Sequence, residues 1–336
     1  MTMPEPPPEI ADSLRRFGLL APGERVAAHA LTGGVSSDIW RIDLPSGAVC
    51  VKRALAKLKV AQDWQAPISR NAYEVAWMQT VARLTPDAVP KVLGHDPQHG
   101  TFAMEFLDSA QHRLWKEDLR QGRVDLDVAR AVGDRLSRIH AGTARDPSIP
   151  PQFPTDAIFH AIRLEPYLEA TARLNPGLAS ALHELVRVTA TNKCALVHGD
   201  VSPKNILIGP RGPIFLDAEC AWFGDPAFDL AFCLNHLLLK CLWAPMAREQ
   251  LLVAFDLLVA SYARGVDWEP EVDVLGRAAR LLPGLLLARV DGKSPVEYVT
   301  LQSDKDRVRR VARQLLLEQP AMPGDVRNAW GAELAR

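Results

Sequence analysis

The residues with the clearest chemical pattern lie between positions 198 and 217. An eight-residue run, HGDVSPKN, starts at His198, and an apolar stretch that ends in Asp217 follows it. This is the spacing H-x-D-x-x-x-x-N, followed by a strand-like run that ends in Asp. Asp200 on a loop could accept a proton from an attacking hydroxyl, while Asn205 and Asp217 could hold Mg²⁺ on nucleotide phosphates. The pattern predicts phosphoryl transfer.

Each part of this pattern also has an ordinary structural explanation. HGD and LDAE could be simple turns in which the aspartates cap helices and the asparagine lies in a loop. Here, however, the whole run lies between two strand-like runs, ALVH and ILI, and the second aspartate ends the next such run. We therefore favour phosphoryl transfer over coincidence.

A lysine and a glutamate nearer the N-terminus could belong to the same site. In the run VCVK, at residues 49–52, the two-residue period of a strand places Lys52 on the face opposite Val51. A lysine there usually lies on an edge strand or a solvated face. Glu74, however, lies beside the apolar stripe of an expected helix, where a carboxylate needs a cation. We predict a Lys52–Glu74 pair that holds the α- and β-phosphates of a nucleotide.

The expected elements change in kind after Asp108. Residues 24–53 alternate short apolar runs with turn signals, which predicts three antiparallel strands. Residues 70–84 have helical spacing, and a further buried strand starts at Gly100. Beyond Asp108 long helical patterns dominate, except for an island of short strands over residues 195–217. Such an island often presents a site.

These patterns define three expected parts of the chain. Residues 1–21 are acidic and Pro-rich, which predicts a flexible leader. Residues 22–108 are expected to form an N-terminal nucleotide-binding lobe and residues 109–336 a C-terminal catalytic and substrate lobe. The expected class is α+β, with a small antiparallel sheet and one helix in the first lobe and mainly helices in the second.

The chain resembles the aminoglycoside phosphotransferase and choline kinase group of small-molecule kinases, roughly from Leu31 to Tyr298. The resemblance rests on LTGGVSSD, FAMEFL, HGDVSPKN, FLDAE and FGDPAFDLA. It implies the two-lobed protein-kinase-like fold, with ATP and Mg²⁺ as cofactors. It also implies that backbone groups of Gly34 and Ser36 approach the phosphates, and that those of Glu105 and Leu107 bond adenine.

Two departures separate this chain from protein kinases. The glycine-rich turn reads GGVSS and not G-x-G-x-x-G, and the metal motif is Asp217-Ala218-Glu219, without DFG. Both features are common in small-molecule kinases of the group. The chain also lacks an A-P-E segment, so a protein substrate is not expected.

A narrower resemblance is to methylthioribose kinases. It is carried by the stretch VKRALAKLKVAQDWQAPISRNAYEVAWM, in which Trp64 precedes the helix that bears Glu74, and by AECAWFGDPAFDLA. It is incomplete, because Ser202 to Asn205 replace a His-Thr-Gly run and a pair of late arginines is reduced to Arg289. A methylthioribose- or choline-type metabolite kinase is therefore an alternative, and a non-catalytic nucleotide-binding regulator is another.

The acceptor should bind between Asp200 and the C-terminal helices. Its candidate contacts are Glu219, Trp222, Asp225, Trp243 and Arg289. The two tryptophans could instead be core residues, Asp225 could cap the helix that begins at Pro226, and Arg289 could pair with a structural carboxylate.

Three further residues are expected to support the site without reacting. Asp229 could brace the catalytic loop from the helix that follows it. His198 could orient that loop through hydrogen bonds, since Asp200 supplies the base. His140 is expected to be a structural histidine.

Composition limits the other functions. The 336 residues are 48% hydrophobic and carry a formal net charge of −1, which gives no basic footprint for nucleic acid. No apolar stretch reaches the roughly 20 residues that a membrane span requires. The five scattered cysteines form no disulfide or zinc pattern and fit a reducing cytoplasm. We expect a soluble cytoplasmic enzyme whose partner is a small-molecule hydroxyl acceptor, with no nucleic-acid or membrane partner.

Overall fold

The computed structural model describes residues 5–31, 37–57 and 67–336, and it divides the chain into two compact units. The first unit is Met1–Gln111 and the second is His112–Arg336. The division thus falls three residues after the boundary that the sequence predicted at Asp108.

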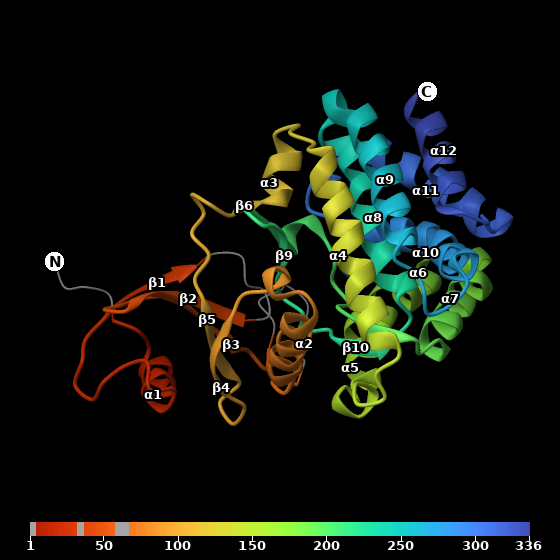
Figure 1. Cartoon of the computed structure of the whole chain (residues 1–336). Helices are drawn as coiled ribbons and strands as arrows, with labels where there is room; N and C mark the ends of the chain where they lie inside the picture. The colour runs from red at the N-terminus through yellow and green to blue at the C-terminus, as the bar shows by residue number, and fades with distance from the viewer. Residues whose placement is uncertain (1–4, 32–36, 58–66) are drawn as a thin grey trace. The chain divides into compact units, whose positions relative to one another are not determined.

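A five-stranded antiparallel sheet forms the centre of the first unit, in the order β1-β2-β3-β5-β4 (Figure 1). Its strands are β1 (Ala27–Leu31), β2 (Ser37–Leu44), β3 (Gly47–Ala54), β4 (Val92–Asp96) and β5 (Thr101–Glu105). The three strands predicted over residues 24–53 and the strand predicted after Gly100 are confirmed. Strand β4 was not predicted, because VLGHD has neither alternation nor a β-branched run.

Helix α2 (Arg70–Leu84) packs against β3, β4 and β5, and the short helix η1 (Pro86–Ala88) follows it. The helix predicted over residues 70–84 is confirmed. On β3 the side chains alternate as expected, because Val51 joins the apolar core on one face while Lys52 faces α2 on the other.

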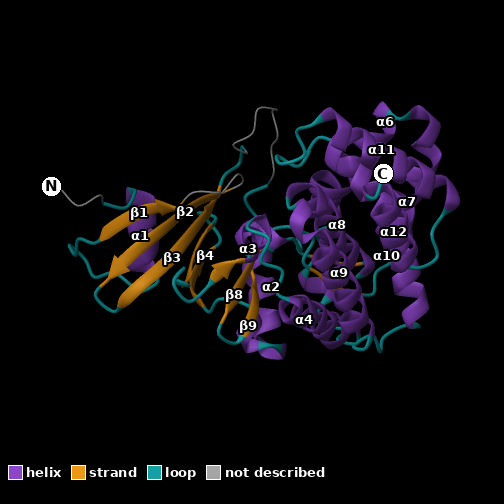
Figure 2. Ribbon diagram, turned by 90° about the horizontal axis from the view of Figure 1, so that it is seen from above, coloured by secondary structure: helices purple, strands orange, loops and turns teal. Residues whose placement is uncertain are grey.

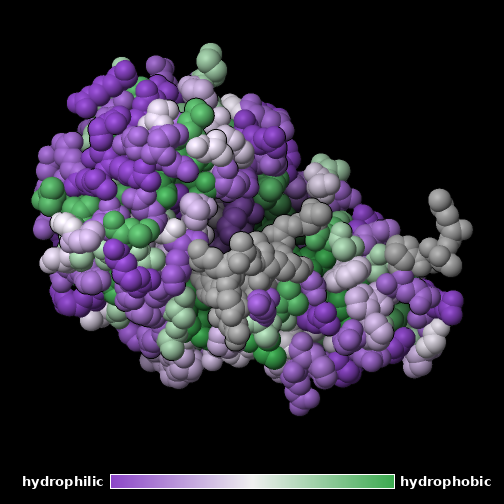
Figure 3. Space-filling model, turned by 180° about the vertical axis from the view of Figure 1, so that it is seen from behind, coloured by the Kyte–Doolittle hydropathy of each residue, from purple (hydrophilic) through white to green (hydrophobic). Residues whose placement is uncertain are grey.

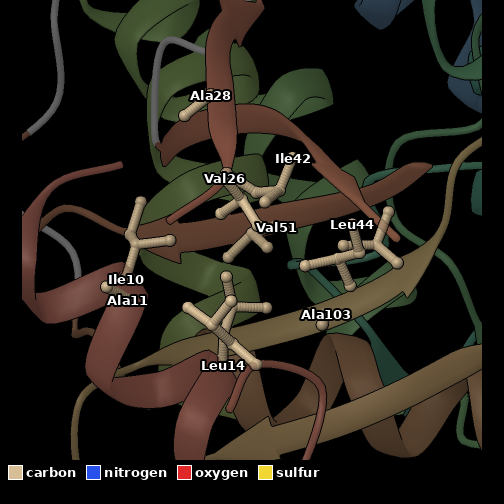
Figure 4. Packing of buried hydrophobic residues seen from close by; sticks show 11 residues of the cluster. Ile10, Ala11, Leu14, Val26, Ala28, Ile42, Leu44, Val51 and Ala103 are labelled. Atoms are coloured by element: carbon tan, nitrogen blue, oxygen red, sulfur yellow. The ribbon is translucent and has the colours of Figure 1, made fainter. Parts of the chain in front are cut away.

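A second helix, α1 (Pro8–Arg16), covers the face of the sheet opposite α2. Its residues Ile10 and Leu14, one helical turn apart, are fully buried against the sheet, and Figure 4 shows them beside Val51. A Cβ at Gly94 of β4 would lie 2.4 Å from the Phe17 ring, so the chain after α1 also packs closely. The prediction of a flexible leader over residues 1–21 was therefore wrong for α1, and the unit has two helices on its sheet, not the single one expected. The sequence analysis missed the apolar stripe of Ile10 and Leu14 because this segment is rich in proline.

The second unit is mainly helical (Figure 2). Its longer helices are α4 (Leu126–Ala144), α7 (Ala179–Thr191), α8 (Ala227–Trp243), α9 (Arg248–Ala263), α10 (Glu271–Asp291), α11 (Gln302–Glu318) and α12 (Pro323–Leu334). Its shorter ones are α3 (Trp115–Arg120), η2 (Pro150–Gln152), α5 (Asp156–Phe159), the π-helical η3 (His160–Glu169), α6 (Ala170–Leu174), η4 (Pro176–Leu178), η5 (Pro203–Asn205) and η6 (Pro245–Ala247).

The predicted island of strands is confirmed within this helical unit. Strands β7 (Ala195–Val197) and β10 (Trp222–Gly224) form an antiparallel pair. Strands β6 (Arg113–Leu114), β8 (Ile206–Gly209) and β9 (Gly212–Phe215) form a three-stranded sheet in the order β6-β8-β9. The loops between β7 and β8 and between β9 and β10 carry the conspicuous polar residues of the sequence.

Helix α8 is the central helix of the second unit and packs against α9 and α10. From Ala227 to Cys241 every residue is buried. Within the described residues no single helix is long and apolar enough to cross a membrane; only α8 and α9 together pass that test, with a bend of 119° between them. On the face seen in Figure 3, hydrophilic residues cover most of the surface and hydrophobic ones are scattered among them.

Candidate active site

The run HGDVSPKN forms the turn that joins β7 to β8. Gly199 has φ +79°, and a Cβ there would lie 2.7 Å from both the Cβ and the carbonyl oxygen of Cys220. Only glycine allows this conformation together with this close approach. The small residue in HGD therefore brings the loop against the chain that follows Asp217.

Asp229, in the first turn of α8, braces this loop by accepting two hydrogen bonds from its backbone. Its Oδ2 accepts a hydrogen bond from the backbone amide of His198 at 2.7 Å, and its Oδ1 accepts one from Gly199 at 2.8 Å. His140 Nε2 lies 3.3 Å from the same carboxylate, and His140 Nδ1 contacts the Tyr262 hydroxyl at 2.9 Å. The predicted roles of Asp229 as a brace and of His140 as a structural histidine are confirmed.

His198 orients the loop through both ring nitrogens. The amide of Asp200 donates to Nδ1 at 3.1 Å, so Nε2 carries the proton and donates to the Leu216 carbonyl at 3.0 Å. Burial lowers the pKa of His198, which favours this neutral form, although Asp229 and Asp200 act in the opposite direction. His198 thus links the HGDVSPKN loop to the end of the β9 segment, as predicted.

Asp200 is 4% exposed and forms two ion pairs. Its Oδ2 lies 3.0 Å from Arg163 Nη2 and 3.0 Å from Lys204 Nζ. Burial acts to raise the pKa of Asp200, but Lys204 and Arg163 outweigh it, so the pKa is below its ordinary value. The carboxylate is therefore held ionised, as an acceptor of a proton must be.

Sequence analysis missed Arg163. It lies on η3, is buried, and donates from Nε to the Gly199 carbonyl and from Nη1 to the Ile162 carbonyl at 2.7 Å. The one local signal was an arginine within a largely apolar run, and such a pattern does not say which carboxylate the arginine meets.

Asn205 and Asp217 are the residues expected to hold a metal. Asn205 Nδ2 donates to the Asp200 carbonyl at 3.1 Å, which leaves Oδ1 as the atom able to ligate, and its own carbonyl accepts from Leu216 at 2.9 Å. Asp217 adopts a left-handed conformation with φ +67°. Its charge acts on the pKa of Asp200, so the two carboxylates are near each other. One amide oxygen and one carboxylate fit a Mg²⁺ ion that also binds phosphate oxygens; no cluster of three or more His, Cys, Asp or Glu suited to a metal occurs in the described parts of the chain.

Lys52 and Glu74 form the predicted ion pair within the first unit. Lys52 Nζ donates to Glu74 Oε1 and Oε2, both at 2.8 Å, and the two residues are 3% and 2% exposed. The pair joins β3 to α2. Because both side chains leave water, each charge is fixed in place by the other.

Four further residues were predicted to bind the nucleotide through backbone groups: Gly34, Ser36, Glu105 and Leu107. Gly34 and Ser36 lie outside the described residues. Glu105 ends β5, where its amide donates to the Lys91 carbonyl at 2.9 Å and is therefore engaged within the first unit. Leu107 follows in the chain after β5 and is half-buried.

Three of the five candidate acceptor residues, Glu219, Trp222 and Arg289, have different environments within the second unit. Glu219 is half-buried, and its charge acts on Arg163. Trp222 is 2% exposed, stacks on Phe159 at 4.2 Å and donates to Asp156 at 2.6 Å. The structure thus favours the core interpretation of Trp222 over an aromatic cage. Arg289 is buried and bonds Tyr167 and Ser294, and no carboxylate among the described residues pairs with it.

Solved structures identify the fold. An amicoumacin kinase, in complex with AMP-PNP and Ca²⁺, is similar over 92% of this chain and 94% of its own, with a TM-score of 0.57 and 14% identity. A choline kinase from Cryptosporidium parvum is similar over 94% of this chain and 97% of its own, with a TM-score of 0.55 and 10% identity. The predicted α+β, protein-kinase-like fold is confirmed.

Sequence comparison identifies the family. A model described as "Phosphotransferase enzyme family" matches residues 27–265, and the chain belongs to this family. The methylthioribose kinase of Pectobacterium carotovorum subsp. carotovorum is 26% identical over 264 residues, which are 69% of this chain and 65% of that protein. That of Yersinia pseudotuberculosis is 24% identical over 265 residues, 69% of this chain and 64% of that protein. The chain therefore spans slightly less than two thirds of these curated relatives.

Proposed function

We propose that this protein is a small-molecule kinase that moves the γ-phosphate of ATP, with Mg²⁺, to a hydroxyl group. The observation that carries the proposal is Asp200: a buried carboxylate, held ionised by two cations, on a loop that Asp229 braces. Membership in the phosphotransferase family and the kinase-like fold support the same reaction class.

Each polar residue then has a distinct role. Asp200 orients the acceptor hydroxyl and takes its proton, while Asn205 and Asp217 hold the metal. Lys52, fixed by Glu74, binds the α- and β-phosphates. When bound, ATP would supply the phosphoryl group, and Mg²⁺ would supply positive charge that screens the negative charge of the phosphates.

Backbone groups complete the nucleotide site in this proposal. Gly34 and Ser36 approach the phosphates, and the Glu105 carbonyl and Leu107 amide bind adenine. The bidentate contact between Lys52 and Glu74 supports a first unit prepared for a nucleotide, since it holds the lysine in one position.

The acceptor is a small molecule, and nucleic acid and membranes are not partners in this proposal. The sequence relatives favour one alternative within the class, a methylthioribose-type kinase. All five cysteines are free, which supports a reducing, cytoplasmic location. A nucleotide-binding regulator without turnover is the rival from another class.

The test is transfer of label from γ-labelled ATP into pooled alcohols, sugars, amino alcohols and aminoglycosides, with D200N as the control. General-base catalysis contributes about 10²- to 10⁴-fold, so D200N should lose that much turnover and still bind Mg·ATP. Label in a small product from the wild type alone supports the kinase. Equal turnover in D200N overturns the assigned role, and nucleotide binding without transfer to any pool favours the regulator.

A further inference from the structure

Helix α8 carries a line of polar residues on one face, although the helix is buried. Asp229, His236 and Lys240 are separated by seven and four residues, so they lie on one side of the helix. Their exposed fractions are 0%, 6% and 1%. The line begins at the carboxylate that braces the catalytic loop, and it leads from that loop into the helical core.

Lys240 is a buried cation without a carboxylate partner. Its Nζ lies 4.3 Å from the centroid of Trp243 and 4.6 Å from that of Tyr298, and these two rings stack on each other at 4.6 Å. Among the described residues no carboxylate oxygen lies within 4.0 Å of Nζ. Burial of an ammonium group without a counter-ion is costly.

Arg289 of α10 is a second buried cation that no carboxylate of the described residues pairs with. Its Nη1 donates to the Tyr167 hydroxyl at 3.1 Å and to the Ser294 hydroxyl at 3.0 Å, which are neutral acceptors. Its Nε is buried and has no hydrogen-bond partner in the part of the chain that the structure describes. A guanidinium group in such a place is suited to a carboxylate or a phosphate.

His236 lies one helical turn before Lys240 on α8, and the charges of Lys240 and Arg289 both act on it. Its Nε2 is buried and lacks a hydrogen-bond partner within residues 5–31, 37–57 and 67–336. Burial, followed by the charges of Arg289 and Lys240, holds the pKa of His236 well below its usual value. The imidazole is therefore neutral, and Arg289 and Lys240 are near enough for their charges to act on it.

Aromatic rings connect this cluster to the catalytic residues. The Arg163 guanidinium, which pairs with Asp200, lies 5.9 Å from the centroid of Tyr167, and Arg289 lies 5.5 Å from the same ring. The rings of Phe232 and His236 are 5.3 Å apart. The cationic cluster and Asp200 thus belong to one continuous region of the second unit.

We propose that the acceptor alcohol carries an anionic group, a carboxylate or a phosphate, that Arg289, His236 and Lys240 bind. This inference rests on the proposed kinase function. The anion supplies the charge that the two cations lack, and it accepts hydrogen bonds from their nitrogens.

The same cluster disfavours cationic acceptors. The stacked rings of Trp243 and Tyr298 could form a cage for a quaternary amine, but the ammonium group of Lys240 already lies against both. An aminoglycoside would place further positive charges beside Lys240 and Arg289, with a repulsive energy that burial increases.

The test compares acceptors with the same skeleton and different charge. Lactobionate, lactose, an amino-lactose, glucose 6-phosphate, glucose and glucosamine are each offered with γ-labelled ATP, so that carboxylate, phosphate, neutral and cationic arms are separate. We expect label in an anionic arm, and lactobionate labelling identifies the carboxylate. K240M should raise the KM of that acceptor at least 10-fold with little change in kcat or in the KM of ATP. R187Q, which removes an exposed arginine of α7, is the matched control.

Preferential labelling of the cationic arm, or an unchanged KM in K240M, would overturn the inference while the kinase stands. If no arm is labelled, the anion site is tested by measuring whether an anion raises the Tm. A higher Tm of the wild type with lactobionate or inorganic phosphate, absent in K240M, supports the anion site and places the failure in the proposed transfer. No such rise overturns the site.

Discussion

Arg163 holds Asp200 through a contact of 3.0 Å between Nη2 and Oδ2, and its Nε donates to the Gly199 carbonyl. One guanidinium group therefore fixes both the Asp200 carboxylate and the backbone just before it. Lys204 reaches the same Oδ2, but its side chain is 49% exposed, so water screens its charge more strongly.

Replacing Arg163 should change the pH dependence of activity. Asp200 has a lowered pKa, so it stays ionised until the pH falls through that value. R163M removes one of the two cations that outweigh burial, so the pKa of Asp200 should rise. The acid limb of kcat/KM should then move to higher pH, with a loss of kcat on the order of 10- to 100-fold from misplacement.

Two variants separate charge from structure in this experiment. R163K keeps the charge and should restore most of the acid limb, although it loses the fork that bonds the Gly199 carbonyl. K204M removes the other cation and should also move the limb to higher pH. Identical limbs in the wild type and R163M would show that Arg163 has no electrostatic role toward Asp200.

Asp229 should contribute strongly to stability as well as to activity. Its two oxygens accept from the amides of His198 and Gly199. D229N keeps the shape but turns an NH₂ group toward one of these N–H donors, which leaves buried donors unsatisfied. We expect a loss of about 2–4 kcal/mol in the free energy of unfolding, measured in urea. E184Q, at an exposed pair on α7, should change it far less, because water screens that pair; an equal effect of both variants would contradict the brace.

Sequence patterns predicted side-chain contacts best where two independent signals converged. Lys52 and Glu74 were paired because strand alternation fixed the face of one and helical spacing fixed the face of the other, and the structure joins them at 2.8 Å. Asp200, Asn205 and Asp217 were found because a local motif contains them. In both cases the local period or motif fixes the direction or the spacing of the side chains.

The missed features depend on contacts between distant segments. Arg163 precedes Asp200 by many residues and has no fixed spacing to it, since η3 and the catalytic loop meet only in the fold. Lys240 of α8 and Arg289 of α10 are near enough for their charges to interact because these two helices pack together. Helix α1 was missed because Pro-rich composition outweighed the short stripe of Ile10 and Leu14.

Replacing one member of the Lys52–Glu74 pair should destabilise the protein more than replacing both members. K52M leaves the buried Glu74 without its Lys52, and E74Q leaves Lys52 without that carboxylate; each should lower the free energy of unfolding by about 3–5 kcal/mol. The K52M/E74Q double variant should lose less than the sum of the two, with a coupling energy measurable in a double-mutant cycle. All three variants should raise the KM of ATP. Additive losses would indicate that the two charges are not coupled.

Lys240 should make stability depend on pH. Burial, with a further contribution from Lys116, lowers its pKa to about 7, far below its value in the unfolded chain. Above pH 7 the unfolded chain therefore binds more protons at this residue than the folded protein, and the free energy of unfolding rises with pH. Other charged or titratable groups that act on it or lie near it are Glu297, Glu117, Arg289 and Tyr298.

K240M isolates this effect, because a methionine of similar volume removes the charge and keeps the packing. Between pH 7 and pH 9 the wild type should gain about 2 kcal/mol relative to K240M in urea unfolding. R187Q, measured over the same range, should follow the wild type. Parallel pH profiles of the wild type and K240M would mean that Lys240 keeps an ordinary pKa, and that its charge is balanced within the protein and not available to an anionic acceptor.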